Sequence, residues 1–334
     1  MPDLKLDINA YREQQHLREQ ETMVQAIRRY YDEVINQIAP IIASGASRVA
    51  INRKLDKILK DMVQKTAARV QKGMQTSWMI AEKRTAELVE QKYKGMELPP
   101  EVEAAVKSHR RDALNKFINR REKGLNLSDR VWKTADQYKD LINQKLDEGI
   151  QEGRSAVKIA KELRQALQDP SPSQESGQGV YKSPVKNTER VARTEVNMAN
   201  RMADQEAWQN NPLVLGYTIN LSATGKPKVR CELCRLLAGD YPVTFIWKGW
   251  HPHCLCFKTP ILMSRAMLDA YNKLIARGED TPEAIAKLQK GARVEQPPSA
   301  LKDWILKNLD RVKGWKSKPY WWEDNEEWVS GLFK

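Results

Sequence analysis

The stretch CELCRLLAGDYPVTFIWKGWHPHCLC, residues 231–256, holds all four cysteines of a 334-residue chain and two of its four histidines. Cys231 and Cys234 form a C-x-x-C pair, whose two thiolates can contact one tetrahedral ion. Cys254 and Cys256 lie two positions apart, so both side chains point to the same side if the backbone is extended. Thiolate and imidazole donors together favour zinc. The stretch therefore predicts one zinc site.

The number of donors exceeds what one zinc ion needs. Sixteen residues separate Cys234 from His251, which is room for one hairpin, and His251 and His253 raise the candidates to six for four positions. We take His253 as a bystander. The predicted ligands are Cys231, Cys234, His251, Cys254 and Cys256. Metal binding would contribute folding free energy to a β unit too small to be stable by burial alone. Two other interpretations stay open, namely reduced core thiols and a disulfide or redox pair.

A catalytic zinc would need an open coordination position and a general base. Zinc-dependent deaminases combine H-x-E with a downstream Pro-Cys-x-x-Cys, whereas here His251 is followed by Pro252 and His253. Motifs of zinc peptidases (H-E-x-x-H), serine hydrolases (G-x-S-x-G) and nucleotide-binding proteins (G-x-x-x-x-G-K-[ST], G-x-G-x-x-G) are also absent from the sequence. We therefore expect closed structural coordination and no enzymatic activity.

Outward from this stretch, the period of the apolar residues distinguishes strands from helices. Alternation at residues 217–221 and 243–247 predicts two short strands that flank the C-x-x-C pair. Spacing of three and four residues predicts helices elsewhere, and they cover residues 23–38, 51–93, 101–123, 131–150, 156–167 and 188–208. Pro40 should end or kink the first of them. Predicted helix caps are Ser128, Ser155, Thr188, Ser264, Thr281 and Ser299.

These elements predict a mainly α protein with a small β unit, of the α+β class. We expect a helical N-terminal domain at 1–127, a zinc-stapled, hairpin-containing module at 128–262 and a helical, Trp-rich C-terminal tail at 263–334. Residues 169–186, rich in Pro, Ser, Gly and Gln, are predicted to form an exposed loop. Five tryptophans fall in the last 34 residues. Their density favours packing against another domain or subunit over base stacking.

The charge of the chain is strongly positive. Lys and Arg number 56 against 43 Asp and Glu, for a net charge of +13, which suits a nucleic acid, an acidic protein surface or simple solubility. The stretch at residues 107–123 holds seven basic residues and two acids. They are candidates for a phosphate-contacting face, although a solvated helix end is the interpretation that we favour. These residues are Lys107, Arg110, Arg111, Lys116, Arg120, Arg121 and Lys123.

The apolar stretches of the sequence are too short to form a membrane-spanning helix, so we expect no membrane as a partner. None reaches the roughly 20 residues that a membrane helix needs, and the first residues lack the apolar stretch of a signal peptide. We expect a soluble chain that is made in a reducing cytoplasm.

Two further residues stand out in the helix predicted at 188–208. Arg193 and Glu195 lie two positions apart, so they do not share a helix face and should not pair with each other. We assign both a structural role. Glu195 is expected to accept hydrogen bonds from the following β unit, and Arg193 to bridge to a carboxylate or a carbonyl.

The order of these features resembles the Mu F-like minor head proteins of tailed bacteriophages, the phage head morphogenesis family. The resemblance runs from about residue 132 to 260 through LDEGIQEGRSAVKIAKELRQAL (146–167), ERVARTEVNMANRMA (189–203), VRCELC (229–234) and HPHCLC (251–256). Arg193, Glu195, the four cysteines and His251 fall on the family pattern. The N-terminal 130 residues match only in being helical. The zinc prediction depends on residue spacing and not on the family.

The resemblance implies a virion component that is present in few copies at the portal vertex or the capsid interior, after synthesis in the host cytoplasm. It implies roles in head assembly and in DNA packaging or ejection, with the portal protein, other head proteins and packaged double-stranded DNA as partners. Some relatives carry a toxin domain, but the tail here has no catalytic constellation. Two alternatives remain open, a metal-dependent DNA-processing enzyme and a free-standing DNA-binding module.

Overall fold

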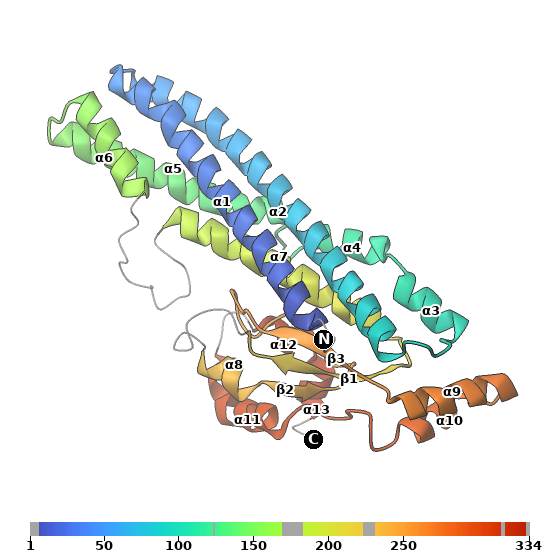
Figure 1. Ribbon diagram of the computed structural model, residues 1–334. Helices are drawn as coiled ribbons and strands as arrows, with labels where there is room; N and C mark the ends of the chain where they lie inside the picture. The colour runs from blue at the N-terminus through green and yellow to red at the C-terminus, as the bar shows by residue number, and fades with distance from the viewer. Residues whose placement is uncertain (1–6, 123, 169–182, 223–230, 315–317, 332–334) are drawn as a thin grey trace, which may run out of the picture. The chain divides into compact units, whose positions relative to one another are not determined.

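The computed structural model describes residues 7–122, 124–168, 183–222, 231–314 and 318–331 (Figure 1). They form a mainly helical protein with one small antiparallel sheet, so the predicted fold class is confirmed. The chain divides into two compact units. The sheet unit comprises Met1–Leu17, Gln75–Leu114 and Asn197–Lys334, and the helical unit comprises Arg18–Met74 and Asn115–Val196. Each unit thus joins segments that are far apart in sequence.

The helical unit is built from long helices with continuous apolar stripes. Helices α1 (Ile8–Ala43), α2 (Arg48–Lys92) and α7 (Pro184–Trp208) contribute residues to both units, while α5 (Leu127–Gln151) and α6 (Ala156–Gln168) belong to this unit alone. Within it, α1 and α2 run side by side (Figure 1). The predicted helices at 51–93, 131–150 and 156–167 are confirmed.

Aromatic packing and one glycine hold the helices of this unit close together. The rings of Tyr31 and Tyr138 meet edge to face at 4.7 Å, and the Tyr138 hydroxyl donates to the Tyr31 carbonyl at 3.2 Å. At Gly73, in the middle of α2, a Cβ would lie 3.0 Å from the Val196 side chain and 3.1 Å from the Met23 sulfur. Glycine therefore weakens the helical propensity at this position but permits the close approach of three helices.

Helix ends in the N-terminal half differ in part from the prediction. Pro40 does not end its helix, because α1 continues through it to Ala43. The helix predicted at 101–123 is instead two short helices, α3 (Pro100–Lys107) and α4 (Arg111–Ile118). The chain is extended at Ser108, and the backbone N–H of Arg110 donates to the Glu82 carboxylate at 2.9 Å. This carboxylate from α2 satisfies a donor that a continuous helix would have used itself.

Helix caps also differ from the prediction in this half. Asn126, and not Ser128, caps α5: its side chain accepts from the Asp129 N–H, and the Asp129 carboxylate accepts from the Asn126 N–H. Helix α7 begins at Pro184, inside the predicted loop, so Thr188 is an interior residue whose hydroxyl bonds to the Pro184 carbonyl at 3.1 Å. The rest of that loop, 169–182, lies outside the described residues. The Ser155 cap is confirmed.

The sheet of the sheet unit has its first strand at the centre. Strand β1 (Val214–Asn220) lies between β2 (Gly239–Tyr241) and β3 (Phe257–Leu262), and both pairings are antiparallel. The strand predicted at 217–221 is thereby confirmed, but the one predicted at 243–247 is wrong. Val243, Phe245 and Trp247 are buried as their alternation suggests. They lie in a loop, so the alternation reflects burial and not strand pairing.

The C-terminal helices belong to the sheet unit. They are α9 (Arg265–Arg277), α10 (Pro282–Gln289), α11 (Ser299–Lys313), α12 (Tyr320–Glu323) and α13 (Glu326–Gly331). Ser264 and Thr281 cap α9 and α10 as predicted, whereas Ser299 is the first residue of α11 and makes no side-chain cap. Trp321 is fully buried with its ring 5.6 Å from that of Trp250. The tail therefore packs against the loop of the cysteine segment within its own unit.

Throughout the described parts of the chain, none of the helices combines the length and the apolar character that crossing a bilayer requires.

Candidate metal centre

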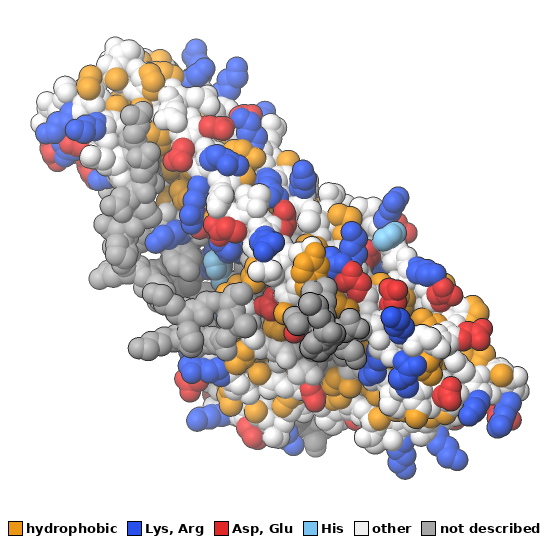
Figure 2. Space-filling model, in the orientation of Figure 1, with side chains coloured by type: hydrophobic (Ala, Val, Ile, Leu, Met, Phe, Trp, Pro, Cys, Tyr) orange, Lys and Arg blue, Asp and Glu red, His pale blue; other side chains and the backbone are white. Residues whose placement is uncertain are grey.

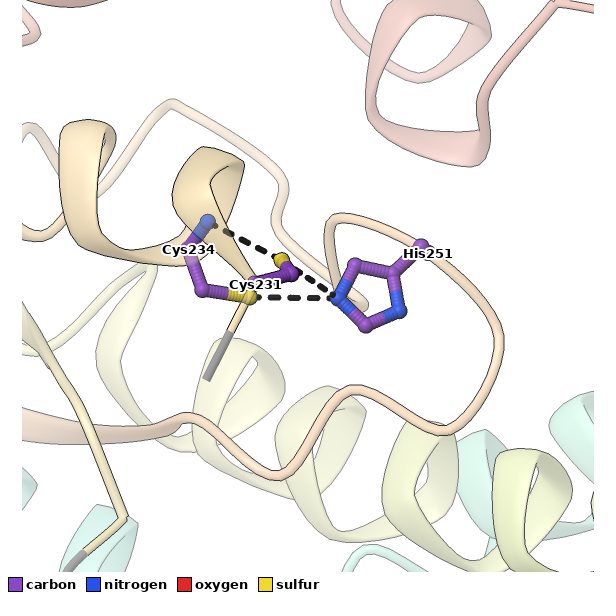
Figure 3. A group of neighbouring side chains, drawn as sticks. All are labelled: Cys231, Cys234 and His251. Carbon is purple, nitrogen blue, oxygen red and sulfur yellow. Dashed lines mark hydrogen bonds between the residues drawn. The ribbon is translucent and has the colours of Figure 1, made fainter. Parts of the chain in front are cut away.

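The first half of the candidate metal centre is a tight turn at the start of the short helix α8 (Glu232–Leu236). Cys231 is the N-cap residue of this helix, and its Sγ accepts a hydrogen bond from the Cys234 N–H at 3.3 Å. This bond from the backbone fixes the position of the Cys231 sulfur in the turn. The C-x-x-C pair thus presents its two sulfurs on one side of the turn, as Figure 3 shows.

The imidazole of His251 faces these two sulfurs. Its Nε2 lies 3.2 Å from the Cys231 Sγ and 3.2 Å from the Cys234 Sγ (Figure 3). The other ring nitrogen, Nδ1, lies 2.7 Å from the Pro252 carbonyl oxygen, which can only accept. Nδ1 therefore carries the proton in the neutral ring, and the Nε2 lone pair points at the sulfurs. Ligating histidines commonly donate their second N–H to a carbonyl in this way.

Cys254 and Cys256 complete the cluster. The Sγ atoms of Cys234 and Cys254 are 3.8 Å apart. The donors form two groups of three, and within each group the possible ligand atoms lie within 4.8 Å of one another. One group is Cys231, Cys234 and His251, and the other is Cys234, Cys254 and Cys256. Cys234 is common to both groups. The structure thus brings together the five metal ligands that were predicted from the sequence, and His253 is in neither group.

The thiols interact strongly with one another. Hydrogen bonds from the Cys234 and Cys256 thiols lower the pKa of Cys254, and the nearby positive charge of Arg201 acts in the same direction. The hydrogen bond with Cys254 raises the pKa of Cys234. The cluster thus favours one thiolate, at Cys254. All four cysteines are free thiols, so no disulfide joins them.

These donors fit a tetrahedral zinc ion. Zinc–sulfur bonds of about 2.3 Å place two sulfurs of one tetrahedron roughly 3.8 Å apart, which is the separation of Cys234 and Cys254. Four of the five residues suffice for closed coordination. Cys234, Cys254 and Cys256 are buried, and Cys231 and His251 are half-buried. A metal bound here would join α8, the His251 loop and the start of β3.

A polar face of α7, which the sequence analysis missed, supports the second half of the centre. The Arg201 guanidinium donates to the carbonyls of Lys248 at 2.6 Å, Cys254 at 2.5 Å and Cys256 at 2.7 Å, and the Asn197 amide donates to the Cys254 carbonyl at 3.1 Å. The sequence does contain a signal. Buried polar residues of α7 recur at spacings of three and four, at Asn197, Asn200, Arg201, Asp204 and Gln205.

Arg193 and Glu195 have their partners in the helical unit. Arg193 pairs with Glu21 at 2.9 Å, as the prediction of a carboxylate partner requires. Glu195 is 1% exposed and accepts from Arg120 at 2.8 Å and from Arg130. The predicted bonds from the β unit to Glu195 are therefore wrong. The donors come from the segment that follows α4 and from α5, and this carboxylate joins both to α7.

The seven residues of the candidate phosphate-contacting face do not lie on one helix. Lys107, Arg110 and Arg111 belong to the sheet unit, Lys116, Arg120 and Arg121 belong to the helical unit, and Lys123 lies outside the described residues. Arg110 donates to the Ala105 carbonyl at 2.6 Å, and Arg120 stacks on Phe117 at 3.7 Å while it pairs with Glu195.

These contacts give Arg110 and Arg120 structural roles. The side chains of Lys107, Arg111, Lys116 and Arg121 are exposed. On the face drawn in Figure 2, Lys and Arg are interspersed with Asp and Glu rather than gathered in one area.

No family model, curated protein or solved structure matches this chain.

Proposed function

We propose that this chain is a structural, non-enzymatic minor head protein of a tailed phage or prophage, acting near the portal vertex in head assembly and in DNA packaging or ejection. The single observation that carries the proposal is the junction between α7 and the cysteine segment. Two of the sequences that carry the family resemblance, ERVARTEVNMANRMA (189–203) and HPHCLC (251–256), meet at this junction, where Arg201 of α7 donates to the carbonyls of Cys254 and Cys256. This contact between two of the resembling sequences is what supports the proposal.

The role of the metal in this proposal is structural. We assign zinc to the donors Cys231, Cys234, His251, Cys254 and Cys256, of which four would hold the ion. When bound, the ion contributes folding free energy to a part of the sheet unit whose strands are three to seven residues long. Neither group of donors includes a carboxylate. The donor set thus suits an ion that holds the loop in place rather than one that activates water.

Co-assembly with a phage head tests the proposal. The chain is expressed together with the portal and head proteins encoded beside it, and particles are purified and analysed for its presence. We expect it in the particles in few copies and bound to the portal ring. Complete heads that assemble with normal yield and DNA content but exclude the chain would contradict the proposal. The purified chain should show no nuclease turnover with added divalent metals, and turnover would favour a DNA-processing enzyme.

The contact with packaged DNA is part of the same proposal. Exposed Lys107, Arg111, Lys116 and Arg121 would contact phosphates, so binding to double-stranded DNA should weaken steeply as salt rises. Replacing Lys116 by Ala should reduce the slope of that dependence by about one. Lys273, which is also exposed and lies on α9, is the control. Equal slopes for Lys116→Ala and Lys273→Ala would remove residues 107–123 from the DNA contact.

A further inference from the structure

The buried guanidinium of Arg201 binds the backbone of the loop that carries His251, Cys254 and Cys256. Arg201 is 4% exposed and donates to the carbonyls of residues 248, 254 and 256. These carbonyls lie before and after His251 and on both sides of Leu255. A buried guanidinium needs several acceptors to offset its loss of water. Its charge-assisted bonds therefore fix the backbone of the loop that carries three of the five donors.

A hydrogen-bonded chain fixes the neighbouring amide in one orientation. Asn197 donates from Nδ2 to the Cys254 carbonyl, so its Oδ1 must accept, and His16 Nε2 lies 2.8 Å from that oxygen. The other His16 nitrogen lies 3.0 Å from the Ser77 hydroxyl. Burial lowers the pKa of His16 to about 4, so the ring is neutral and can donate at one nitrogen while it accepts at the other.

The loop is also shaped to admit the guanidinium. Gly249 has a φ of 137°, and a Cβ at this position would lie 2.6 Å from Nη1 of Arg201. Any other residue would adopt a rare backbone conformation and would also displace Arg201. The guanidinium lies over the Trp247 ring at 4.5 Å. Residues 247–249 (WKG) thus leave the space that the Arg201 side chain of α7 occupies.

We propose that Arg201 and Asn197 are positioning residues of the metal site, which hold Cys254 and Cys256 in place opposite Cys234 before the ion binds. The inference depends on the proposed zinc site. Without these donors, the carbonyls of residues 248, 254 and 256 lose these hydrogen bonds, two of which are buried, and the loop has to be ordered by the metal itself. Metal binding then becomes weaker and the bound geometry less uniform. The positive charge of Arg201 also offsets the negative charge of the thiolates around a divalent ion.

Metal titration of the full-length protein tests this inference. Zinc affinity is measured by competition with a chromophoric chelator, and cobalt(II) is used as a spectroscopic probe, since its visible bands report tetrahedral geometry and thiolate ligation. The variants are Arg201→Met, Arg201→Lys and Asn197→Ala. The matched control is Asn200→Ala. This residue is buried on the same helix and donates one bond to the Ser77 carbonyl at 2.8 Å, with no bond to the loop.

Loss of a supporting interaction of this kind weakens metal affinity by about 10- to 100-fold. We expect that loss in Arg201→Met, a smaller loss in Asn197→Ala, and partial recovery in Arg201→Lys. The cobalt bands should shift or broaden in the first two and remain as in the native protein for Asn200→Ala. If Arg201→Met fails to fold, Arg201→Lys and Asn197→Ala decide the question.

The two proposals fail in different ways. A native protein that binds neither zinc nor cobalt would overturn the metal site itself. Native binding with unchanged affinity and spectra in all folded Arg201 and Asn197 variants would overturn only the positioning role. A loss of equal size in Asn200→Ala would show a general effect of α7 stability and would also overturn it.

Discussion

The two units of the molecule achieve order by different means, and α7 shows the contrast within one helix. Its first half places Ala192 and Val196 in the apolar core of the helical unit. Its second half places Asn197, Arg201 and Asp204 in the interior of the sheet unit, against carbonyls and charged groups. An apolar face tolerates small shifts, whereas each of these polar groups needs one partner in one place.

The helical unit distributes its stability over many similar contacts, while the cysteine segment concentrates it in a few. In the helical unit, apolar residues repeat along four long helices, so the loss of any one is a local matter. In the sheet unit, the loop between residues 242 and 256 has no strand of its own, and the groups that meet around it are five candidate metal donors and the guanidinium of Arg201. Substitutions at these few positions should therefore have the largest effects in the molecule.

Replacing Cys234 by Ser should have the largest effect, because Cys234 is the donor common to both groups. Structural zinc contributes on the order of 10 kcal/mol to folding in small zinc-binding domains, so we expect loss of metal and unfolding of the cysteine segment. Among the described tryptophans, Trp132 alone lies in the helical unit. Near-ultraviolet circular dichroism should thus lose the contributions of Trp247 and Trp250, which lie in the cysteine segment, while far-ultraviolet helicity largely persists.

The control for this prediction is Leu236→Ser on the same short helix, where the side chain is 46% exposed. It should retain both the metal and the tryptophan signal. Retention of one zinc per chain and of the native near-ultraviolet spectrum in Cys234→Ser would remove the distinction between the two units.

Replacing Glu195 by Ala should have the opposite effect to Cys234→Ser, because it should destabilise the helical unit and leave the sheet unit unchanged. The change removes the buried carboxylate that Arg120 and Arg130 share, while their pairing with the half-buried Glu122 remains. Removal of one partner of a buried ion pair costs about 3 to 5 kcal/mol, and the remaining pairing places this loss at the lower end. The two arginines are 16% and 17% exposed, so partial hydration should keep the loss near about 3 kcal/mol. Chemical denaturation followed by far-ultraviolet circular dichroism measures it, with zinc content unchanged.

Glu21→Ala is the matched control, because Glu21 also pairs with an arginine but its side chain is 50% exposed. A surface pair of this kind contributes less than about 1 kcal/mol. Equal losses for both variants would mean that burial of Glu195 adds nothing.

The contrast also explains which parts of the structure the sequence could predict. Apolar stripes such as Val131, Ala135, Tyr138 and Ile142 repeat over many turns, and each residue adds to one signal, so the helices and the α+β class were predictable. The spacing of the cysteines and His251 was equally informative, because the chemistry of a tetrahedral ion limits which residues can share it.

Single long-range contacts left no such repeated signal. The break between α3 and α4 depends on Glu82, which is 28 residues from the backbone donor that it binds. The partners of Glu195 lie 65 and 75 residues before it. Residues 243–247 alternate like a strand although they form a buried loop, since burial of every second side chain does not require strand pairing. These features depend on tertiary neighbours that spacing cannot identify.

Acidification should weaken the sheet unit through His16. Burial lowers the pKa of His16 from 6.5 to about 4, so the unfolded chain binds more protons between these values and stability falls as the pH drops from 6.5 to 4. The difference corresponds to about 3 kcal/mol across that window. His16→Gln keeps a donor for Asn197 and does not titrate. The gap in unfolding free energy between the two proteins should therefore narrow by this amount on acidification, and a constant gap would contradict a buried neutral ring.

The smallest predicted effect concerns a single helix cap in the helical unit, where Asn126 and Ser128 can be compared. Asn126 accepts from the Asp129 N–H at 2.8 Å, so Asn126→Ala should cost about 1 kcal/mol. Ser128 already lies inside α5, where alanine is the better helix former, and Ser128→Ala should be neutral or slightly stabilising. Thermal denaturation of both variants measures the difference. The opposite order would place the helix start where the sequence pattern put it, since a residue contributes as a cap only if its side chain reaches a free backbone donor.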